Sequence, residues 1–237
     1  MKRVLAFVPA RKCSKGLPGK NTRLFAGKPL VAYTLEAAKA CMGMDVFVST
    51  DDDQVIAVAE GLDLGTEYRR PSSLAGDGAA MADVVTDGLT WLAARGRKPE
   101  VVVLLQPTSP LRLSADIEGA LELFFKSRAP TVVGVSPMWT HPTECLQRRG
   151  ANWEYLVQPK VGAVRRQDYD GEYLFINGAI YIMWSERFLV DRTFVAPNSE
   201  LYCMDSTNTV DIDYERDFIV AEALMRRRQG VKANDGT

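Results

Sequence analysis

Histidine is nearly missing from this sequence of 237 residues, since His141 is the only one. A metal site built from several histidines is therefore excluded, and a Ser-His-Asp triad would have a single possible base, in a loop bounded by proline. The cysteines form no C-x-x-C pair, so we expect reduced thiols and no zinc knuckle or redox motif. They are Cys13, Cys41, Cys145 and Cys203.

Long apolar runs are missing as well, and no stretch approaches the length that crosses a membrane. The run from Val4 to Ala10 is similar to the core of a signal peptide, but it is short, contains Pro9 and is followed at once by Arg11 and Lys12. We therefore predict a buried strand here, in a cytoplasmic protein with no membrane partner.

The chain has no excess of charge of either sign, because its net charge is −1 at pH 7. We therefore expect no nucleic-acid partner, and we assign the three arginines at 226–228 to the end of a helix. The positive charge is unevenly placed, however. Residues 1–28 hold eight Lys or Arg and no acid, whereas the rest of the chain holds 21 basic and 30 acidic residues. Such a segment is typical of a site for an anion.

The hydrophobic content of 46% is enough for one large domain, which we place at residues 1–230 with a flexible tail at 231–237. Short apolar runs without alternation are typical of strands buried on both faces of a parallel sheet, and they occur at 4–8, 46–49, 101–105 and 131–135. Helical patterns lie between them, starting at Pro29, at Asp51 or Asp52, at Met81, and at Ser114 as a cap. The alternation predicts an α/β fold, a three-layer sandwich with a mainly parallel sheet.

The segment 137–172 interrupts this alternation, because it is rich in Trp, Tyr, Arg and turn residues. We predict a protruding hairpin arm, and the sequence leaves open whether it contacts a second subunit or covers a site within one chain. The sandwich is expected to resume with strands at 179–183 and 209–212. It should end with a helix from Tyr214 to Gln229.

The candidate anion site is the loop at residues 9–21, after the first strand. Ligands of open α/β sheets bind at the carboxyl ends of the strands, and glycines let backbone N–H groups approach phosphate oxygens. The loop is no Walker A motif, because Ser14 and Asn21 stand where Gly and a Ser or Thr are required, and it lacks a G-x-G-x-x-G fingerprint. A solvated basic turn is the alternative, but five cations in residues 11–23 without one carboxylate argue against it. They are Arg11, Lys12, Lys15, Lys20 and Arg23.

Asp211 and Asp213 are the candidate metal ligands. Alternate residues of a strand point the same way, so both carboxylates would face one Mg²⁺ while Ile212 enters the core. The alternative is that Asp213 caps the following helix. A second acidic cluster, 51–53, is assigned mostly to helix capping. Gln106 leaves its strand at the same edge, where an amide would orient a polar ligand.

Five motifs occur in order along residues 4–218. They are Ala10-Arg11 with Ser14-Lys15-Gly16-Leu17-Pro18-Gly19-Lys20-Asn21, Ser49-Thr50-Asp51, Leu105-Gln106-Pro107-Thr108-Ser109-Pro110-Leu111-Arg112, Asn177-Gly178-Ala179-Ile180-Tyr181 and Asp211-Ile212-Asp213. Together they resemble the acylneuraminate cytidylyltransferases, or CMP-sialic acid synthetases. The resemblance implies a Rossmann-like, GT-A-like nucleotidyltransferase sandwich. It also implies transfer of CMP from CTP to the anomeric 2-hydroxyl of a nine-carbon 2-keto sugar acid (a nonulosonic acid), with release of pyrophosphate, Mg²⁺ as cofactor and a homodimer.

The resemblance also implies a role for each matching residue. Lys20 would neutralise charge at the α-phosphate, with Arg11 and Asp211 beside it in catalysis, and Asp211 and Asp213 would bind the metal. The nucleotide would be held by Pro9, Ala10, Arg11, Ser14, Lys15, Asn21, Arg70 and Asp77. The sugar would be held by Gln106, Arg166, Tyr181 and Phe194, with Arg166 reaching the site of a neighbouring subunit from the arm.

Four residues depart from the sialate pattern, namely Met81, Glu144, Phe175 and Thr193. Glu144 and Phe175 replace cations on the sugar side, so the acceptor could be a related nonulosonate such as legionaminic acid or the deaminated sugar Kdn. Two alternatives to this activity remain at this point. One is a cytidylyltransferase for the eight-carbon sugar acid Kdo, and the other is a nucleotide-binding sensor that has lost catalysis.

Overall fold

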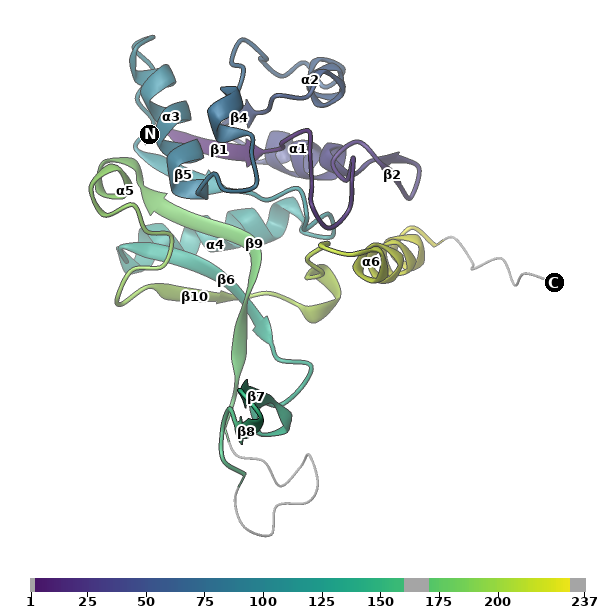
Figure 1. Ribbon diagram of the computed structural model, residues 1–237. Helices are drawn as coiled ribbons and strands as arrows, with labels where there is room; N and C mark the ends of the chain where they lie inside the picture. Colours follow the sequence, from purple (N-terminus) through teal and green to yellow (C-terminus); the bar gives the residue numbers. More distant parts are fainter. Residues whose placement is uncertain (1–2, 160–170, 231–237) are drawn as a thin grey trace, which may run out of the picture.

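A six-stranded sheet forms the centre of the protein (Figure 1). The computed structural model describes residues 3–159 and 171–230. The strand order is β10-β6-β9-β5-β1-β4, in which β9 is antiparallel to both neighbours and the other pairs are parallel. The predicted mainly parallel sheet is thus confirmed. Its strands are β1 (Val4–Pro9), β4 (Met44–Ser49), β5 (Val101–Leu104), β6 (Thr131–Pro137), β9 (Leu174–Trp184) and β10 (Glu200–Cys203).

Helices cover both faces of the sheet, which makes the predicted three-layer sandwich. One face packs against α1 (Leu30–Ala40), α2 (Asp53–Glu60) and α4 (Ser114–Ser127). The other face packs against α3 (Met81–Ala93) and α5 (Ser185–Asp191). The strand β5, near the centre of the sheet, is apolar and buried throughout, as expected for a strand covered on both faces.

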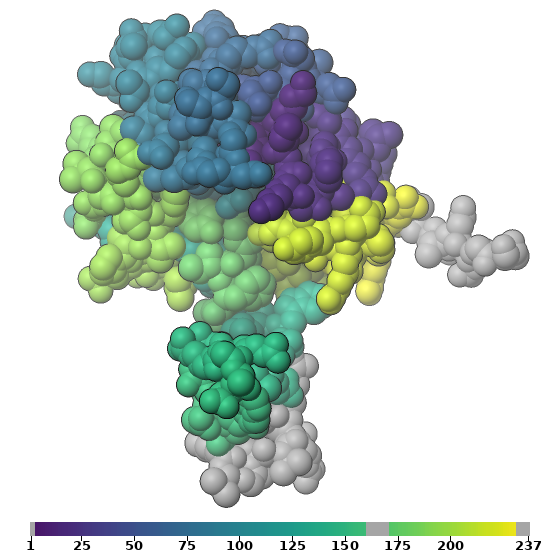
Figure 2. All heavy atoms as spheres, in the orientation of Figure 1, coloured from purple at the N-terminus to yellow at the C-terminus, as the bar shows by residue number. Residues whose placement is uncertain are grey.

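A third cluster of buried residues, away from the sheet, fixes the N-terminal loop. It joins Leu17 of that loop to Ile212 and to Phe218 of the last helix, α6 (Glu215–Arg228). Figure 2 shows α6, in yellow, packed against the N-terminal segment in purple. This contact brings two segments nearly 200 residues apart in sequence to the same edge of the sheet.

The first residues and caps predicted for the helices are confirmed in part. The Asp52 carboxylate accepts a hydrogen bond from the Gln54 N–H at the start of α2, as expected. Pro29 comes directly before the first residue of α1 instead of occupying it. At α4 the cap is not Ser114, because the Asp116 carboxylate reaches back to the Leu113 N–H at 2.8 Å.

The prediction of a strand at 209–212 is wrong. The sheet contains β10, at 200–203, instead. The Ile212 N–H donates to the Thr108 carbonyl of the loop after β5, and the Ile212 side chain packs in the third cluster. The apolar residues here therefore serve a loop contact and not a sheet. β10 pairs only with β6, and most of its residues are exposed, so it lacks the buried apolar pattern of the central strands.

The arm predicted within 137–172 projects from the sandwich (Figure 1). It contains the antiparallel hairpin of β7 (Leu146–Arg149) and β8 (Asn152–Tyr155), with Gly150 at φ +64° in its turn. The expected sugar-binding Arg166 and the expected tail, 231–237, lie outside the described residues. Across the described part of the chain, no helix combines the length and apolarity needed to cross a bilayer.

Candidate active site

A cavity of about 610 Å³ opens where β1 and β5 end, at the sheet edge expected for a ligand. It brings together most of the predicted nucleotide residues with one of the two aspartates. Its lining is Pro9, Arg11, Ser14, Lys15, Gly16, Lys20, Asn21, Arg70, Met81, Gln106, Pro107, Thr108, Asp213 and Tyr214. Ala10 is fully buried behind it, and its N–H donates to the Ser49 carbonyl.

Two side chains, those of Asn21 and Asp51, hold the backbone of the cationic loop in shape. The Asn21 amide donates to the Arg11 carbonyl at 2.8 Å, which closes the loop across its base. The Asp51 carboxylate accepts from the Lys12 N–H at 2.8 Å. Asp51 therefore anchors the loop, and with Asp52 at the cap of α2 the acidic cluster at 51–53 has a largely structural role. Arg11, Lys15 and Lys20 of the loop line the cavity.

Lys20 connects the loop to the aspartates. The residue is only 7% exposed, and its Nζ donates to the Ile212 carbonyl at 2.5 Å and to Asp213 Oδ1 at 3.2 Å. A buried ammonium group attracts a neighbouring anion more strongly than one in water does, because less solvent screens the interaction. Lys20 of the cationic loop therefore contacts Asp213, one of the two predicted metal ligands.

Asp213 does not cap α6. The Asp217 carboxylate does so instead, because it accepts from the N–H groups of Asp213 and Tyr214 at 3.1 and 2.9 Å. The Asp213 carboxylate is left to pair with Lys20 at the rim of the cavity. The capping alternative for Asp213 is thus wrong in this structure, and Asp217 is a residue that the sequence analysis missed.

Asp211 lies beside the backbone of β9. A Cβ placed on Gly178, whose φ is +74°, would be 3.2 Å from Asp211 Oδ2 and 3.9 Å from Gln106 Nε2. Glycine at this position therefore makes room for the carboxylate and the amide together. Burial raises the pKa of the Asp211 carboxyl, the Thr108 hydroxyl opposes this rise, and the Asp213 carboxylate adds to it. A cation bound between these two carboxylates would reduce their electrostatic repulsion.

A buried arginine, Arg112, connects the structural elements around the site. The Arg112 guanidinium donates to the Ala179 carbonyl at 2.7 Å, to the Gln106 carbonyl at 3.3 Å and to the Thr34 hydroxyl at 2.8 Å. It therefore links β9, the loop after β5 and α1. Burial lowers the pKa of Arg112 to about 10, so the guanidinium remains charged at neutral pH.

Arg70 lines the cavity, and Asp77 contacts another lining residue, Arg11. The Arg70 guanidinium donates to the Ser49 hydroxyl and carbonyl, at 3.1 and 2.6 Å, and burial lowers its pKa. Asp77 pairs with Arg11 at 2.7 Å. Both predicted residues are thus next to the cavity, but each is engaged with protein groups. Their positions are set before any ligand enters.

A second cavity of about 340 Å³ adjoins the first, and the two share Met81 and Gln106. We call it the acceptor pocket; its lining is Met81, Leu104, Gln106, Tyr181, Arg192, Thr193, Phe194 and Val195. The predicted sugar residues Tyr181 and Phe194 face each other across 5.8 Å between ring centroids. Burial and the nearby Asp211 raise the pKa of Tyr181, so this pocket also lies close to the aspartates.

Arg192 in this pocket was not predicted, although it directly precedes Thr193 and Phe194 in the sequence. Among the departures from the sialate pattern, Met81 and Thr193 line the pocket. Glu144 lies in the arm, and Phe175 lies near the start of β9.

A cluster of three His, Cys, Asp or Glu residues able to hold a metal is not found within 3–159 and 171–230. Asp211 and Asp213 are the predicted acidic donors, and a metal ion held by two carboxylates would take its further ligands from a bound substrate or from water. Such a set of oxygen donors suits Mg²⁺, which keeps several non-protein ligands.

Comparison with known proteins agrees with this geometry. Residues 5–181 match the model of a protein family described as "Cytidylyltransferase". The chain is 34% identical to the CMP-N,N'-diacetyllegionaminic acid synthase of Legionella pneumophila, over 96% of this chain and 98% of that protein. It is also 34% identical to an N-acylneuraminate cytidylyltransferase of Streptococcus agalactiae, over 91% of this chain, but it spans only 51% of that longer relative.

Solved structures show the same fold at low sequence identity. A CMP:2-keto-3-deoxy-manno-octonic acid synthetase complexed with CTP superposes with a TM-score of 0.69 at 17% identity, covering 96% of this chain and 100% of that chain. A 4-diphosphocytidyl-2C-methyl-D-erythritol synthase superposes with a TM-score of 0.66 at 12% identity, covering 94% of this chain and 100% of that chain. At these identities the likeness concerns the fold alone.

Proposed function

Because the chain belongs to the cytidylyltransferase family, we propose that it transfers CMP from CTP to the anomeric 2-hydroxyl of a nine-carbon 2-keto sugar acid. The observation that carries this proposal is the contact of Lys20 with Asp213 in a cavity that opens into the acceptor pocket. A triphosphate in the first cavity and a sugar in the second would place the α-phosphate and the hydroxyl near this pair.

In the proposed reaction the 2-hydroxyl oxygen forms a bond to the α-phosphorus of CTP. The bond from this phosphorus to the bridging oxygen breaks, pyrophosphate leaves, and the hydroxyl proton passes to a carboxylate or to water. Lys20 neutralises the charge that develops on the α-phosphate, and Arg11 and Lys15 bind the outer phosphates. No acyl-type nucleophile is needed, which agrees with the single histidine.

We propose that Asp211 and Asp213 hold Mg²⁺ as the cofactor of this reaction. The raised pKa of Asp211 and the repulsion between the two carboxylates support a cation at this place. When bound, the ion would withdraw electrons from the phosphate oxygens. Asp211, next to Gln106 and Gly178, would in addition orient the attacking hydroxyl.

The acceptor pocket supports a nine-carbon acid over the eight-carbon alternative. Its predicted sugar residues Gln106, Tyr181 and Phe194 line one cavity, and the full-length sequence relative at 34% identity is named for a nine-carbon sugar. The eight-carbon enzyme is similar in fold alone. We also keep Arg166 as a proposed sugar-binding residue that acts across subunits. Nothing in the site favours a sensor without catalysis, because the Lys20 and Asp213 pair is in place.

The test of the proposed function is pyrophosphate release from CTP with a panel of 2-keto sugar acids. The panel contains acylated nine-carbon acids, the deaminated nine-carbon acid and the eight-carbon acid, and ATP, GTP and UTP replace CTP as controls. We expect turnover with CTP and at least one nine-carbon acid. Folded protein that releases no pyrophosphate with any nine-carbon acid would contradict the proposal.

The cationic loop gives a second prediction. A Cβ on Gly16 would lie 2.3 Å from the Asp213 carbonyl oxygen, so Gly16→Ala must push the loop away from the aspartates. We expect kcat/KM for CTP to fall about tenfold, because small misplacements of binding groups are costly. Gly65→Ala is the control, since a Cβ there meets nothing within 4 Å. Unchanged CTP kinetics in Gly16→Ala would show that this contact does not position the loop.

We further propose that residues 1–230 act as a single nucleotidyltransferase domain and that the arm joins two copies into a homodimer. Leu146, Trp153 and Leu156 of the arm are 56 to 59% exposed. Apolar side chains gathered on a protruding hairpin are typical of a surface that a partner covers. A second copy is the partner we propose.

Trp153→Ser tests the dimer. We expect the wild type to have twice the chain mass of 26.2 kDa in light scattering and the variant to shift toward a single chain, because an aromatic anchor contributes strongly to an interface. Ile219→Ser on α6, where Ile219 is 60% exposed, is the control and should leave the mass unchanged. A wild-type protein that measures as one chain at all concentrations would refute the dimer.

A further inference from the structure

One charged side chain, Arg192, lines the acceptor pocket in the part of the chain that the structure describes. It forms an ion pair with Asp83, which lies in the first turn of α3. Met81 is two residues before Asp83 and lines both cavities. The pair therefore stands between the start of α3 and the end of α5, on one side of the pocket.

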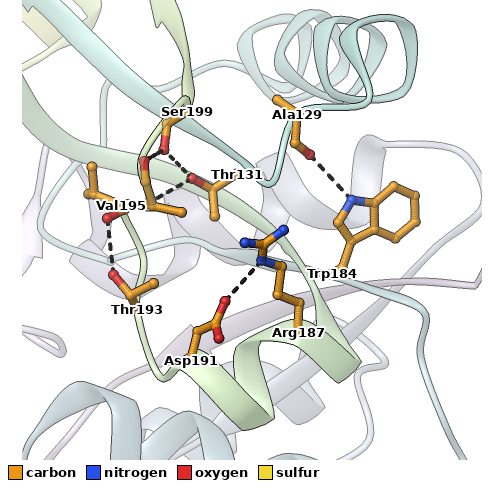
Figure 3. A network of polar contacts seen from close by, with 9 residues as sticks. Ala129, Thr131, Trp184, Arg187, Asp191, Thr193, Val195 and Ser199 are labelled. Carbon is orange, nitrogen blue, oxygen red and sulfur yellow. Dashed lines mark hydrogen bonds and ion pairs between the residues drawn. The ribbon is translucent and has the colours of Figure 1, made fainter.

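The backbone around Arg192 is held firmly. Arg192 ends α5 in the left-handed region, at φ 52°, with its N–H bonded to the Phe188 carbonyl. Figure 3 shows how the following loop is tied down: the Thr193 hydroxyl donates to the Val195 carbonyl at 3.0 Å, and Thr131 contacts Ser199 at 2.5 Å. A site supported in this way can discriminate between ligands, because its groups do not have to be ordered on binding.

The electrostatics of the pair point to a neutral partner. Asp83 cancels the positive charge of Arg192 and engages Nη2, while the remaining N–H groups of the guanidinium can still donate. The side chains are 43% and 51% exposed, so a ligand can reach them. Because Asp83 already balances the charge of Arg192, a ligand carboxylate would gain little electrostatic attraction here. A ligand carbonyl oxygen would still accept a hydrogen bond from the ionised guanidinium.

The walls around the pair are apolar. Met81, Leu104, Phe194 and Val195 line the same pocket and suit a methyl group. A substituent that combines a carbonyl oxygen with a methyl group is an acylamino group. We propose that Arg192, positioned by Asp83, is a specificity-determining residue that donates to the acyl oxygen of the acceptor and selects acylated nine-carbon acids over those that carry a hydroxyl instead. This assignment rests on the proposed function.

The experiment compares kcat/KM for two nine-carbon 2-keto sugar acids, one acylated and one with a hydroxyl in place of the acylamino group. The wild type is expected to prefer the acylated acid. Arg192→Ala should lower kcat/KM for that acid about tenfold, the value of a charge-assisted hydrogen bond. It should change kcat/KM for the hydroxyl acid by less than about threefold and leave KM for CTP unaltered.

Asp83→Asn gives a second measure of the same pair. We expect a smaller loss in the same direction and a double variant that is no worse than Arg192→Ala, because both changes break one interaction. Thermal unfolding checks that each variant is folded. Arg187→Ala is the control, since Arg187 pairs with Asp191 outside the acceptor pocket (Figure 3) and should leave the preference intact.

Three outcomes would overturn the assignment. Equal losses for both acids would place Arg192 at a group that both share, such as the carboxylate. Unchanged selectivity in folded Arg192→Ala and Asp83→Asn would remove the pair from recognition. Wild-type protein that turns over neither acid would refute the proposed function itself, and with it this role of Arg192.

Discussion

Replacing Lys20 with methionine is expected to slow CMP transfer by at least about two orders of magnitude, the effect of removing one preorganised group that stabilises developing charge. The Lys20 ammonium is confined between the Ile212 carbonyl and the Asp213 carboxylate, beside the cavity proposed for the triphosphate. Methionine keeps the apolar stem that fills this space but cannot neutralise a phosphate oxygen. Single-turnover rates with CTP and an accepted sugar acid measure the effect on the chemical step.

Lys28→Met is the matched control for this change. Lys28 pairs with Glu36 at 2.7 Å on the surface, away from both cavities, and exposed pairs of this kind contribute little. Its rate should stay close to that of the wild type. A fall of less than about threefold in folded Lys20→Met would contradict the role of Lys20, since charge stabilisers of this type are worth far more.

The central strands and the cationic loop could be predicted from the sequence because local signals determine them. Strands buried on both faces read as unbroken apolar runs, as in β1 and β5. The loop after β1 concentrates cations without a single acid. Its place at the carboxyl edge of the sheet then follows from the topology of α/β folds.

Features that depend on tertiary contacts could not be read in the same way. The segment 209–212 has the composition of a strand, but its partner is the loop after β5 and not the sheet. The edge strand β10 is mostly exposed and so carries no such signal. Arg192 has no local motif at all, because the role we propose for it depends on Asp83, which lies more than 100 residues earlier.

The family resemblance implies that the cationic loop and the two aspartates belong to one site, and the structure gives a physical cause for the contact of Lys20 with Asp213. Leu17, Ile212 and Phe218 share one buried cluster, so apolar packing brings the two charged segments together. The side chains of Asp211, Ile212 and Asp213 differ in burial in the alternating way that a strand would produce. Ile212 is fully buried while Asp211 and Asp213 on either side of it are exposed, although no strand forms.

Asp213→Asn is expected to raise the Mg²⁺ concentration that gives half-maximal activity by at least about tenfold, the lower end of what the loss of even an outer-shell partner costs. It should also reduce the rise in unfolding temperature that Mg²⁺ produces in the wild type, because at a given concentration a ligand that binds the folded protein more weakly stabilises it less. Asp217, not Asp213, caps α6, so the helix should remain intact in this variant.

Asp217→Ala separates the two roles, because alanine lacks the oxygen that accepts from the N–H groups of Asp213 and Tyr214. Loss of this cap is expected to lower stability by about 1 kcal/mol, with little change in the Mg²⁺ titration. Asp213→Asn should instead raise the Mg²⁺ concentration that gives half-maximal activity, while its free energy of unfolding without metal stays nearly unchanged. If the two variants showed the same Mg²⁺ dependence as the wild type, Asp213 would serve only to pair with Lys20, and the metal would have to be held by Asp211 together with the substrate.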